Sequence, residues 1–407
     1  MRWYYFLLLT AIAYSCGSKT TQEIEKLPEA GVYQGTLDIQ GNPLIFRFEI
    51  KHKPLTFILD NIDESFKIED FTLTEDSLVV PLHIFDTQLK AAYKQGRFEG
   101  HWIKNYADGY EIAFSAQKEE VLSAGSEGTM ATPSTLASKY RVYFESEIED
   151  STVAVAEFEQ NGNMIKGTFL TETGDYRFLN GTIKGNQLKL STFDGEHAFV
   201  FAGEVDDAGM IHGHFASGKT WHEQWWAHPD MEVQLADAST ITYLKNGAKT
   251  LHFEGKALDG TSVNLDDDML NGKPFILQIM GTWCPNCMDE TKFLSQWHTL
   301  NPDIGVELVS LAFERKDNYQ YAKERLTLLR DRFNVGYPLL FGGGYDKELA
   351  TKKLPELSAV VAYPTLVFYN SNHEVTHIHT GFTGPGTGVH FERWKLDFEK
   401  RVAEIAP

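Results

Sequence analysis

Cysteine is scarce in this sequence: its 407 residues contain only three, at Cys16, Cys284 and Cys287. Three cysteines exclude a framework of several disulfides and a zinc site made of four thiolates. Clusters of basic residues are also lacking, and 37 Lys and Arg against 57 Asp and Glu give a net charge of −20. The charge argues against nucleic acid as a partner, because phosphate backbones require clustered Lys and Arg.

Long apolar runs are missing as well, since no run approaches the about 20 residues that a membrane span needs. Residues 1–16 carry one Arg, a short apolar stretch and then a cysteine, which indicates a secretory signal. The segment resembles a bacterial lipoprotein signal, with Ala13-Tyr14-Ser15-Cys16 as the lipobox. That resemblance implies a lipid on Cys16 and an extracytoplasmic, periplasmic protein anchored to a bacterial membrane. An ordinary signal peptide with an incidental cysteine is the alternative.

Alternation of apolar and polar residues dominates the chain from Gly31 to about Asp230. Short alternating runs broken by Gly, Asn and Asp are typical of strands and hairpins, so we predict a mostly antiparallel β region. Clear examples are residues 44–50, 151–158 and 187–190. The predicted division is signal and lipobox 1–16, polar tether 17–30, β-rich unit 31–122, linker 123–138, second β-rich unit 139–238, and an α/β domain 239–407.

A weak internal repeat links the two β-rich units. Phe85-Asp86 corresponds to Phe193-Asp194, and residues 98–102 correspond to residues 211–215 at a similar offset. We therefore expect two related β units, arranged as sandwiches, barrels or one composite structure.

Aromatic residues gather near the end of the second unit, at Trp221, Trp225 and Trp226 with His222 beside them. They could line a ligand face, but we favour a role in a β core or at the seam to the next domain. This half of the chain shows no catalytic constellation.

The last part of the chain alternates strands with helices, which predicts an α/β domain. A buried strand at 273–280 leads directly into Cys284, and the helix after it places Phe293, Leu294, Trp297 and Leu300 at helical spacing. Further predicted elements are a strand at 306–313, a helix with Ala322, Leu326, Leu329 and Phe333 on one face, strands at 365–370 and 375–380, and a helix presenting Phe391, Trp394, Phe398, Val402 and Ile405.

The pair Cys284-Pro285-Asn286-Cys287 is the strongest chemical signal. A helix that begins at this turn stabilises a thiolate on Cys284, while Cys287 lies one helical turn on and can close a disulfide. Pro285 suits the first turn because its missing N–H is not needed there. Zinc would require two more ligands, and the nearest paired histidines, His377 and His379, lie on a later strand. We therefore predict redox chemistry at this pair, with no metal and no cofactor.

Residues from about 251 to the end resemble the TlpA/ResA family of thioredoxin-like, membrane-tethered, extracytoplasmic thiol-disulfide oxidoreductases. The matching motifs are Trp283 to Cys287, Ala362 to Thr365, Lys352 to Pro355 and His379 to Gly388. The resemblance implies a central mixed sheet flanked by helices and a cis Pro364 whose loop faces the Cys pair. It also implies that Trp283, Tyr363 and Thr365 contact the substrate, with the Tyr363 backbone pairing with an extended segment.

Proton transfer is expected to involve Glu290. Thioredoxins carry a buried Asp six residues before the first cysteine, where this chain has Gln278, and an amide cannot shuttle a proton. In the TlpA/ResA family the task is thought to fall to the position of Glu290, three residues after Cys287. Alternatively, Glu290 only favours the helix dipole, as we expect of Asp289.

The predicted function is reduction of disulfides in extracytoplasmic client proteins, with a membrane-bound thiol donor restoring the dithiol. A peroxidase is disfavoured, because the peroxiredoxin pattern requires Pro at Leu277 and Thr at Gly281. A copper-binding chaperone and a ligand-binding lipoprotein with an accessory redox domain stay open as alternatives. The Pro285-Asn286 dipeptide tunes the potential, so reductant, oxidant and isomerase are not distinguished by sequence.

Overall fold

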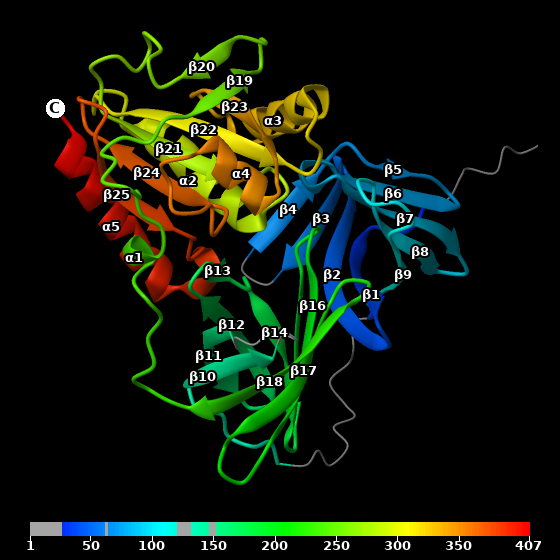
Figure 1. The fold of residues 1–407 in the computed structure, drawn as a ribbon. Coiled ribbons are helices and arrows are strands. Elements are labelled where there is room, and N and C mark those ends of the chain that lie inside the picture. Colours follow the sequence, from blue (N-terminus) through cyan, green and yellow to red (C-terminus); the bar gives the residue numbers. More distant parts are fainter. Residues whose placement is uncertain (1–26, 62–63, 120–131, 146–151) are drawn as a thin grey trace, which may run out of the picture.

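The computed structural model describes residues 27–61, 64–119, 132–145 and 152–407. Cys16, most of the tether 17–30 and most of the linker 123–138 lie outside these residues. Figure 1 shows three bodies, two built from strands and one from strands and helices, with the C-terminal domain resting on both β units. Among the described residues, no helix is both long and apolar enough to span a membrane.

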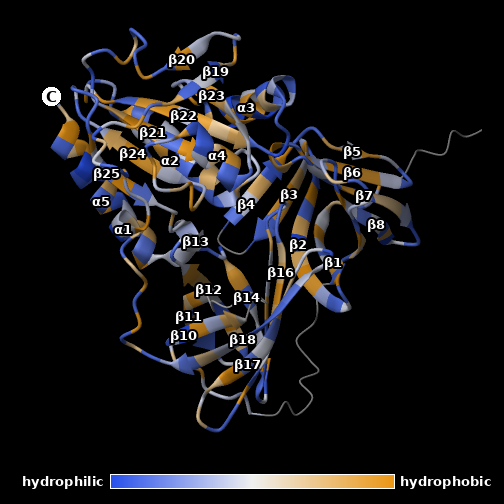
Figure 2. Ribbon diagram, in the orientation of Figure 1, coloured by the Kyte–Doolittle hydropathy of each residue, from blue (hydrophilic) through white to orange (hydrophobic). Residues whose placement is uncertain are grey.

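The first β unit is one antiparallel sheet in the order β4-β3-β2-β1-β9-β8-β7-β6-β5, which is open because no ladder joins β4 to β5 among the described residues. Buried and exposed residues alternate along β2, visible as hydrophobic and hydrophilic bands in Figure 2. The strands are β1 (Gly31–Ile39), β2 (Asn42–His52), β3 (Leu55–Asn61), β4 (Glu64–Ile68), β5 (Thr72–Leu73), β6 (Ser77–Leu82), β7 (Thr87–Lys94), β8 (Arg97–Lys104) and β9 (Glu111–Lys118), with a 3-10 turn η1 (His83–Phe85).

The second β unit is a closed antiparallel barrel. Its order runs β11-β10-β18-β17-β16-β15-β14-β12-β13, and pairing of β11 with β12 closes the ring. Closure removes the exposed sheet edges that would otherwise invite pairing with other chains. The strands are β10 (Lys139–Glu145), β11 (Thr152–Asn161), β12 (Met164–Thr171), β13 (Gly174–Asp175), β14 (Leu179–Lys184), β15 (Gln187–Phe193), β16 (Ala198–Val205), β17 (Ile211–Ser217) and β18 (Trp221–Pro229).

The two segments matched by the weak repeat occupy equivalent places. Residues 98–102 lie in β8 and residues 211–215 in β17, each the last strand but one of its unit. The middle residue of each segment is a glycine packed against the neighbouring strand: a Cβ would lie 2.0 Å from the Lys90 carbonyl oxygen at Gly100, and 2.1 Å from that of Ala202 at Gly213. Both units therefore use the same close approach of two strands.

The tryptophans of β18 divide between core and surface. Trp225 is buried inside the barrel against Phe169 and Phe201, as expected for a core residue. Trp221 is 55% exposed, so the expectation of a core or seam role is wrong for that residue. The two residues lie on the same side of a strand whose pairing with β17 is regular, so Trp221 differs from Trp225 by its place at the exposed start of β18.

The C-terminal domain contains a seven-stranded sheet in the order β20-β19-β23-β22-β21-β24-β25. Strands β21, β22 and β23 run parallel, and β24 and β25 are antiparallel additions. The predicted α/β class with a mixed central sheet is confirmed. The elements are α1 (Ala238–Ile241), β19 (Glu254–Ala257), β20 (Ser262–Asn264), β21 (Phe275–Met280), α2 (Pro285–Leu300), β22 (Glu307–Glu314), α3 (Tyr319–Phe333), β23 (Leu339–Gly344), α4 (Lys347–Lys353), β24 (Thr365–Tyr369), β25 (Val375–Thr380), a 3-10 turn η2 (Pro385–Thr387) and α5 (Val389–Ile405).

Two details of this domain differ from the sequence pattern. Leu300, the last residue of α2, is 79% exposed, whereas Trp297 in the same turn is buried. Strands β19, β20 and β23 and helices α1 and α4 were not predicted. The sequence of β23 ends in three glycines, which lack the side chains that mark a strand, and pairing with β22 supplies its order instead.

Candidate active site

Cys284 and Cys287 lie where buried strand β21 passes through a tight turn into helix α2. Cys284 is the N-cap of α2, and its Sγ accepts a hydrogen bond from the Cys287 N–H at 3.3 Å. The sulfur therefore lies at the positive end of the helix dipole, next to an amide N–H. Both cysteines are free in the structure, so the site is in its dithiol form.

The two sulfurs differ in exposure. Cys284 retains 7% exposure, whereas Cys287 is fully buried. Burial raises the pKa of the Cys287 thiol well above its ordinary value, and the neighbouring Cys284 sulfur raises it further. The arrangement gives Cys284 the position of an attacking thiol and Cys287 that of a thiol that acts later, from inside the domain.

The loop before β24 faces the first sulfur. The Tyr363-Pro364 peptide bond is cis, and the Tyr363 carbonyl oxygen lies 3.4 Å from Cys284 Sγ, which donates to it. The Trp283 and Tyr363 rings meet edge to face with centroids 5.5 Å apart. Thr365 is buried, and its hydroxyl donates to the Ala362 carbonyl oxygen, so its side chain braces the loop. The structure thus brings Trp283, Tyr363 and Pro364 together around Cys284.

A buried polar network lies beneath the cysteines. Gln278 of β21 donates from Nε2 to Glu290 Oε2 at 2.8 Å, and its Oε1 accepts from Ser310 at 2.6 Å and Thr291 at 3.2 Å. Glu290 is fully buried and its Oε1 has no hydrogen-bond partner among the described residues. Burial raises the pKa of Glu290 well above its usual range, and the nearby Cys284 sulfur adds to the shift. Gln278 therefore holds a carboxyl group whose neutral form is favoured by burial.

A second buried acid, Glu314, supports the turn that carries Cys284. Its carboxylate accepts from the Thr282 N–H at 3.0 Å and from the Thr282 hydroxyl at 2.7 Å. Burial raises the pKa of Glu314 to about 7, although the two bonds from Thr282 oppose that shift. Sequence reasoning missed this residue, because an acid at the end of a strand resembles an ordinary surface position until the sheet covers it.

Trp283 is held by an ion cluster that joins all three bodies. The Arg315 guanidinium lies 4.7 Å from the Trp283 ring centroid and donates to Glu196 Oε1 at 2.6 Å. The same carboxylate oxygen accepts from Lys104 at 2.9 Å and from Tyr106 at 2.7 Å. Glu196 belongs to the barrel, Lys104 and Tyr106 to the open sheet, and Arg315 to the C-terminal domain, so both β units help to position the residue before Cys284.

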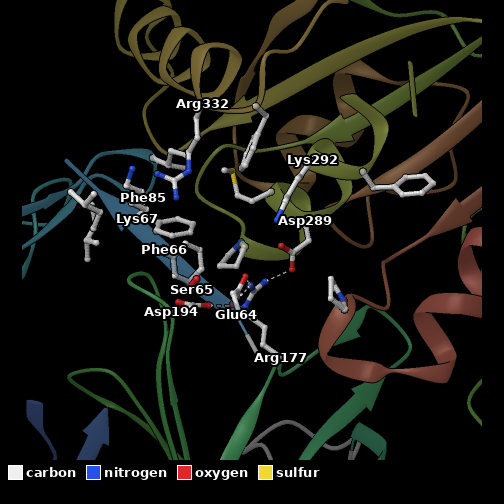
Figure 3. A pocket seen from close by; sticks show the side chains of 18 of the residues that line it. Glu64, Ser65, Phe66, Lys67, Phe85, Arg177, Asp194, Asp289, Lys292 and Arg332 are labelled. Atoms are coloured by element: carbon white, nitrogen blue, oxygen red, sulfur yellow. Dashed lines mark hydrogen bonds and ion pairs between the residues drawn. The ribbon is translucent and has the colours of Figure 1, made fainter. Parts of the chain in front are cut away.

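A second cluster centres on Arg177, in the barrel segment between β13 and β14. Its guanidinium pairs with Asp289 of α2 at 2.7 Å, with Glu64 of β4 at 2.6 Å and with Asp194 at 3.3 Å. Figure 3 shows Arg177 between Glu64 and Asp289. Burial raises the pKa of Asp289 to about 7, although Arg177 opposes the shift. Asp289, expected to favour the helix dipole, therefore also anchors α2 to the barrel.

The barrel segment also contacts the loops around the cysteines. Asn286, between the two cysteines, donates to the Asp175 carbonyl oxygen at 3.5 Å. The Asp175 carboxylate accepts from the Gly384 N–H at 2.7 Å, in the loop after β25. Beside these contacts lies a cavity of about 670 Å³ where β4, the barrel and α2 meet, lined in part by Pro285, Met288 and Arg332 (Figure 3).

Comparison with known proteins finds a family match in this region. Residues 246–378 match the AhpC/TSA family. The thiol-disulfide oxidoreductase ResA of Halalkalibacterium halodurans is 25% identical over 137 residues, which is 33% of this chain and 68% of that protein. The ResA of Oceanobacillus iheyensis is 27% identical over 124 residues, 30% of this chain and 57% of that protein.

The C-terminal region has a thioredoxin-like fold and is similar in sequence to thiol-disulfide oxidoreductases. Solved structures similar to it include a thioredoxin-family thiol:disulfide interchange protein from Chlorobium tepidum, with 19% identity, a TM-score of 0.30, and coverage of 39% of this chain and 95% of that chain. Another is a secreted disulfide oxidoreductase from Mycobacterium tuberculosis, with 23% identity, a TM-score of 0.27, and coverage of 37% and 95%.

The thioredoxin-like domain does not accommodate the peroxidase pattern at Gly281. A Cβ there would lie 2.3 Å from Trp283 Nε1 and 2.8 Å from the Phe313 carbonyl oxygen, to which that Nε1 donates. A threonine at this position would displace the tryptophan beside Cys284. The close packing agrees with the sequence, which lacks the Pro and Thr that the peroxiredoxin pattern requires.

Proposed function

We propose that this chain reduces disulfide bonds in extracytoplasmic client proteins, is held at a bacterial membrane by a lipid on Cys16, and is restored by a membrane-bound thiol donor. The observation that carries the redox part is the pairing of a slightly exposed Cys284 at the N-terminus of α2 with a fully buried Cys287 one turn away. The thioredoxin-like fold and the relatives named for thiol-disulfide exchange support the same chemistry.

The reaction consists of two exchanges. The Cys284 thiolate attacks one sulfur of the client disulfide, a mixed disulfide forms, and the other client sulfur leaves as a thiolate. Cys287 then loses its proton and attacks Cys284 Sγ, which releases the second client thiolate and leaves a Cys284–Cys287 disulfide. Two electrons pass to the client, and a dithiol donor returns them to the enzyme.

Glu290 is proposed as the group that accepts the Cys287 proton. Cys287 is fully buried, so its deprotonation needs a nearby acceptor, and the Glu290 charge is close enough to raise the Cys287 pKa. A deprotonated Glu290 takes up the proton because burial favours the neutral carboxyl group. Gln278 holds one carboxyl oxygen and leaves the other without a partner among the described residues.

Client binding is proposed at the face formed by Trp283, Tyr363 and Pro364. Hydrogen bonding between Cys284 and the Tyr363 carbonyl group places the backbone of the loop before β24 next to the attacking sulfur. A client segment that pairs with this loop would present its disulfide to Cys284. Neither the copper chaperone nor the ligand-binding lipoprotein has an observation in its favour at this face.

The test of the function is a trapping experiment in cells. Cys287→Ser should accumulate mixed disulfides between Cys284 and client proteins, because the resolving thiol is absent. Cys284→Ser/Cys287→Ser is the matched control and should trap none. Purified wild type should reduce a model peptide disulfide stoichiometrically, and Cys284→Ser should not. Full activity in Cys284→Ser would contradict the assigned roles.

The lipid tether has its own test, because Cys16 lies outside the described residues. Labelled fatty acid should enter the wild type and not Cys16→Ala. Unmodified wild type in the soluble extracytoplasmic fraction would support an ordinary signal peptide instead.

A further inference from the structure

Two histidines and an aspartate meet between edge strand β25 and helix α5 of the thioredoxin-like domain. His377 and His379 lie on edge strand β25, separated by the buried Ile378, so both point to the same side of the strand. Asp397 comes from α5, which packs beside this strand through Trp394, whose ring lies 6.3 Å from that of His379. Only the packing of the last helix brings the carboxylate to the histidines.

The donor atoms of these residues converge. One nitrogen of each histidine and one carboxylate oxygen of Asp397 all lie within 4.8 Å of one another, and each residue is half-buried. Tetrahedral zinc, with bonds of about 2.0–2.1 Å, spaces its ligands about 3.4 Å apart. Side-chain rotations that draw the atoms together by up to about 1.4 Å are therefore enough to complete the site.

An unpartnered polar atom points to a ligand at this place. His377 Nε2 is buried and has no hydrogen-bond partner among the described residues. A buried nitrogen without a partner costs free energy that a bound cation would recover.

We propose that His377, His379 and Asp397 bind a zinc ion, with water as the fourth ligand. Two imidazoles and one carboxylate form a donor set that suits Zn²⁺ better than Ca²⁺ or Mg²⁺, which prefer oxygen ligands alone. His379 also lines a cavity of about 420 Å³ between the barrel and the thioredoxin-like domain, which provides a route for the ion.

Charged side chains next to the proposed ligands affect the binding of a cation. Arg401 pairs with Asp397 at 3.3 Å and with Glu404 at 3.2 Å, so it can stay with Glu404 when Asp397 turns to the metal. Asp237, at the start of α1, lies near enough to affect the charge of both histidines. Three acids, Asp237, Asp397 and Glu404, therefore lie around Arg401 and the two histidines.

Zinc at this place would fasten edge strand β25 to helix α5. The strand runs directly into the loop that holds Gly384 against Asp175 of the barrel. A bound ion would thus stabilise the part of the domain on which the barrel rests, without contact with Cys284 or Cys287. The site is independent of the proposed redox function.

The experiment uses the full chain with its three cysteines replaced by Ser, so that no thiol can bind metal. After treatment with a chelator and its removal, titration calorimetry with Zn²⁺ should show one equivalent, and Zn²⁺ should raise the melting temperature. Co²⁺ in place of Zn²⁺ should give the visible absorption of a four-coordinate site. His379→Ala and Asp397→Asn should each weaken zinc binding at least about tenfold.

His252→Ala provides the matched control, because His252 is an exposed histidine of the same domain that pairs with Glu356. It should bind zinc like the parent chain. Asp397→Asn keeps the shape of the side chain on a half-exposed helical position, so its folding can be verified by circular dichroism. Absence of a stoichiometric zinc site in the parent chain, or equal affinity in the folded Asp397→Asn variant, would overturn the proposal.

Discussion

Buried carboxyl groups give the active site its chemical character at the scale of single residues. Glu290 and Glu314 are both fully buried, and burial raises the pKa of each. Their partners differ, since Glu290 accepts one hydrogen bond from the Gln278 side-chain amide, whereas Glu314 accepts two hydrogen bonds from Thr282. We therefore expect Glu290 to move protons and Glu314 to hold the Cys284 turn in place.

Glu290→Gln should change the pH dependence of Cys284 reactivity. In the wild type, Glu290 loses its proton above its usual range, and the new negative charge then opposes formation of the Cys284 thiolate. The variant lacks that charge, so alkylation of reduced Cys284 should be faster at high pH and should lose one inflection. The measurement is the alkylation rate against pH, with exposed Glu324→Gln as control. Superimposable profiles would reduce Glu290 to a structural acid.

Glu314→Gln should flatten the dependence of stability on pH. The folded-state pKa of about 7 exceeds the ordinary 4.5, so the folded protein binds more protons than the unfolded chain between these values. Stability therefore falls as pH rises from about 4.5 to 7, by up to about 3 kcal/mol for this group. Denaturant unfolding at several pH values should show a smaller fall in the variant, and Glu307→Gln, at a surface ion pair, should follow the wild type. An unchanged slope would contradict the assignment.

At the scale of elements, the two β units resemble each other most clearly in strands β8 and β17. β8 and β17 each place a glycine where the next strand passes too close for a side chain. The surrounding burial pattern is the same in both, with buried residues two positions to either side of the glycine. Close packing of neighbouring backbones, and not hydrophobicity, therefore makes this position distinctive.

Gly213→Ala should destabilise the barrel by about 1–3 kcal/mol, because the added methyl group meets the Ala202 carbonyl oxygen and the Trp225 indole. Thermal unfolding of the full chain, followed by tryptophan fluorescence, measures the loss. His214→Ala, at the exposed neighbouring position of β17, should have an effect within about 0.5 kcal/mol. Equal stability of the two variants would show that β16 and β17 can separate without cost.

At the scale of the whole molecule, two ion clusters join the β units to the thioredoxin-like domain. Arg177 joins the barrel to the open sheet through Glu64 and to the catalytic helix through Asp289. Glu196 joins the barrel to Arg315, which lies against Trp283. Both clusters end next to the Cys pair, so the position of the β units and the environment of Cys284 are coupled.

Arg177→Gln should loosen the barrel segment from α2. Removing the guanidinium leaves Asp289, Glu64 and Asp194 close together without their cation, which costs about 3–5 kcal/mol when such a group is buried. We expect a lower melting temperature and several-fold faster alkylation of Cys284, because Asn286 loses the support of Asp175.

Arg141→Gln is the control for that variant, because Arg141 pairs with Asp230 within the barrel and far from α2 in the chain. It should leave the alkylation rate unchanged. A wild-type alkylation rate in Arg177→Gln would show that the barrel segment does not restrict access to the thiol.

Local sequence signals were sufficient for the fold class and for the thiol pair. Short-range rules predict β21 and α2 from a run of apolar residues, a tight turn and a helix start. The proximity of the two cysteines is also local, because their spacing along one helical turn depends only on helix geometry. The bounds of β25 follow from its alternating pattern in the same way. The predicted roles of Glu290 and Pro364 stay predictions, although the structure places both next to the cysteines.

Only the tertiary structure decided which distant residues meet these local elements. Glu314, Arg177 and Asp397 look like surface charges in the sequence, and each acquires its partner through packing of strands or bodies far apart in the chain. The sequence alone determined the helix-start dithiol, because neighbours along the chain build it. It left open the carboxyl environment, the docking of the barrel and the histidine–aspartate cluster, because burial and pairing of charges depend on contacts between remote segments.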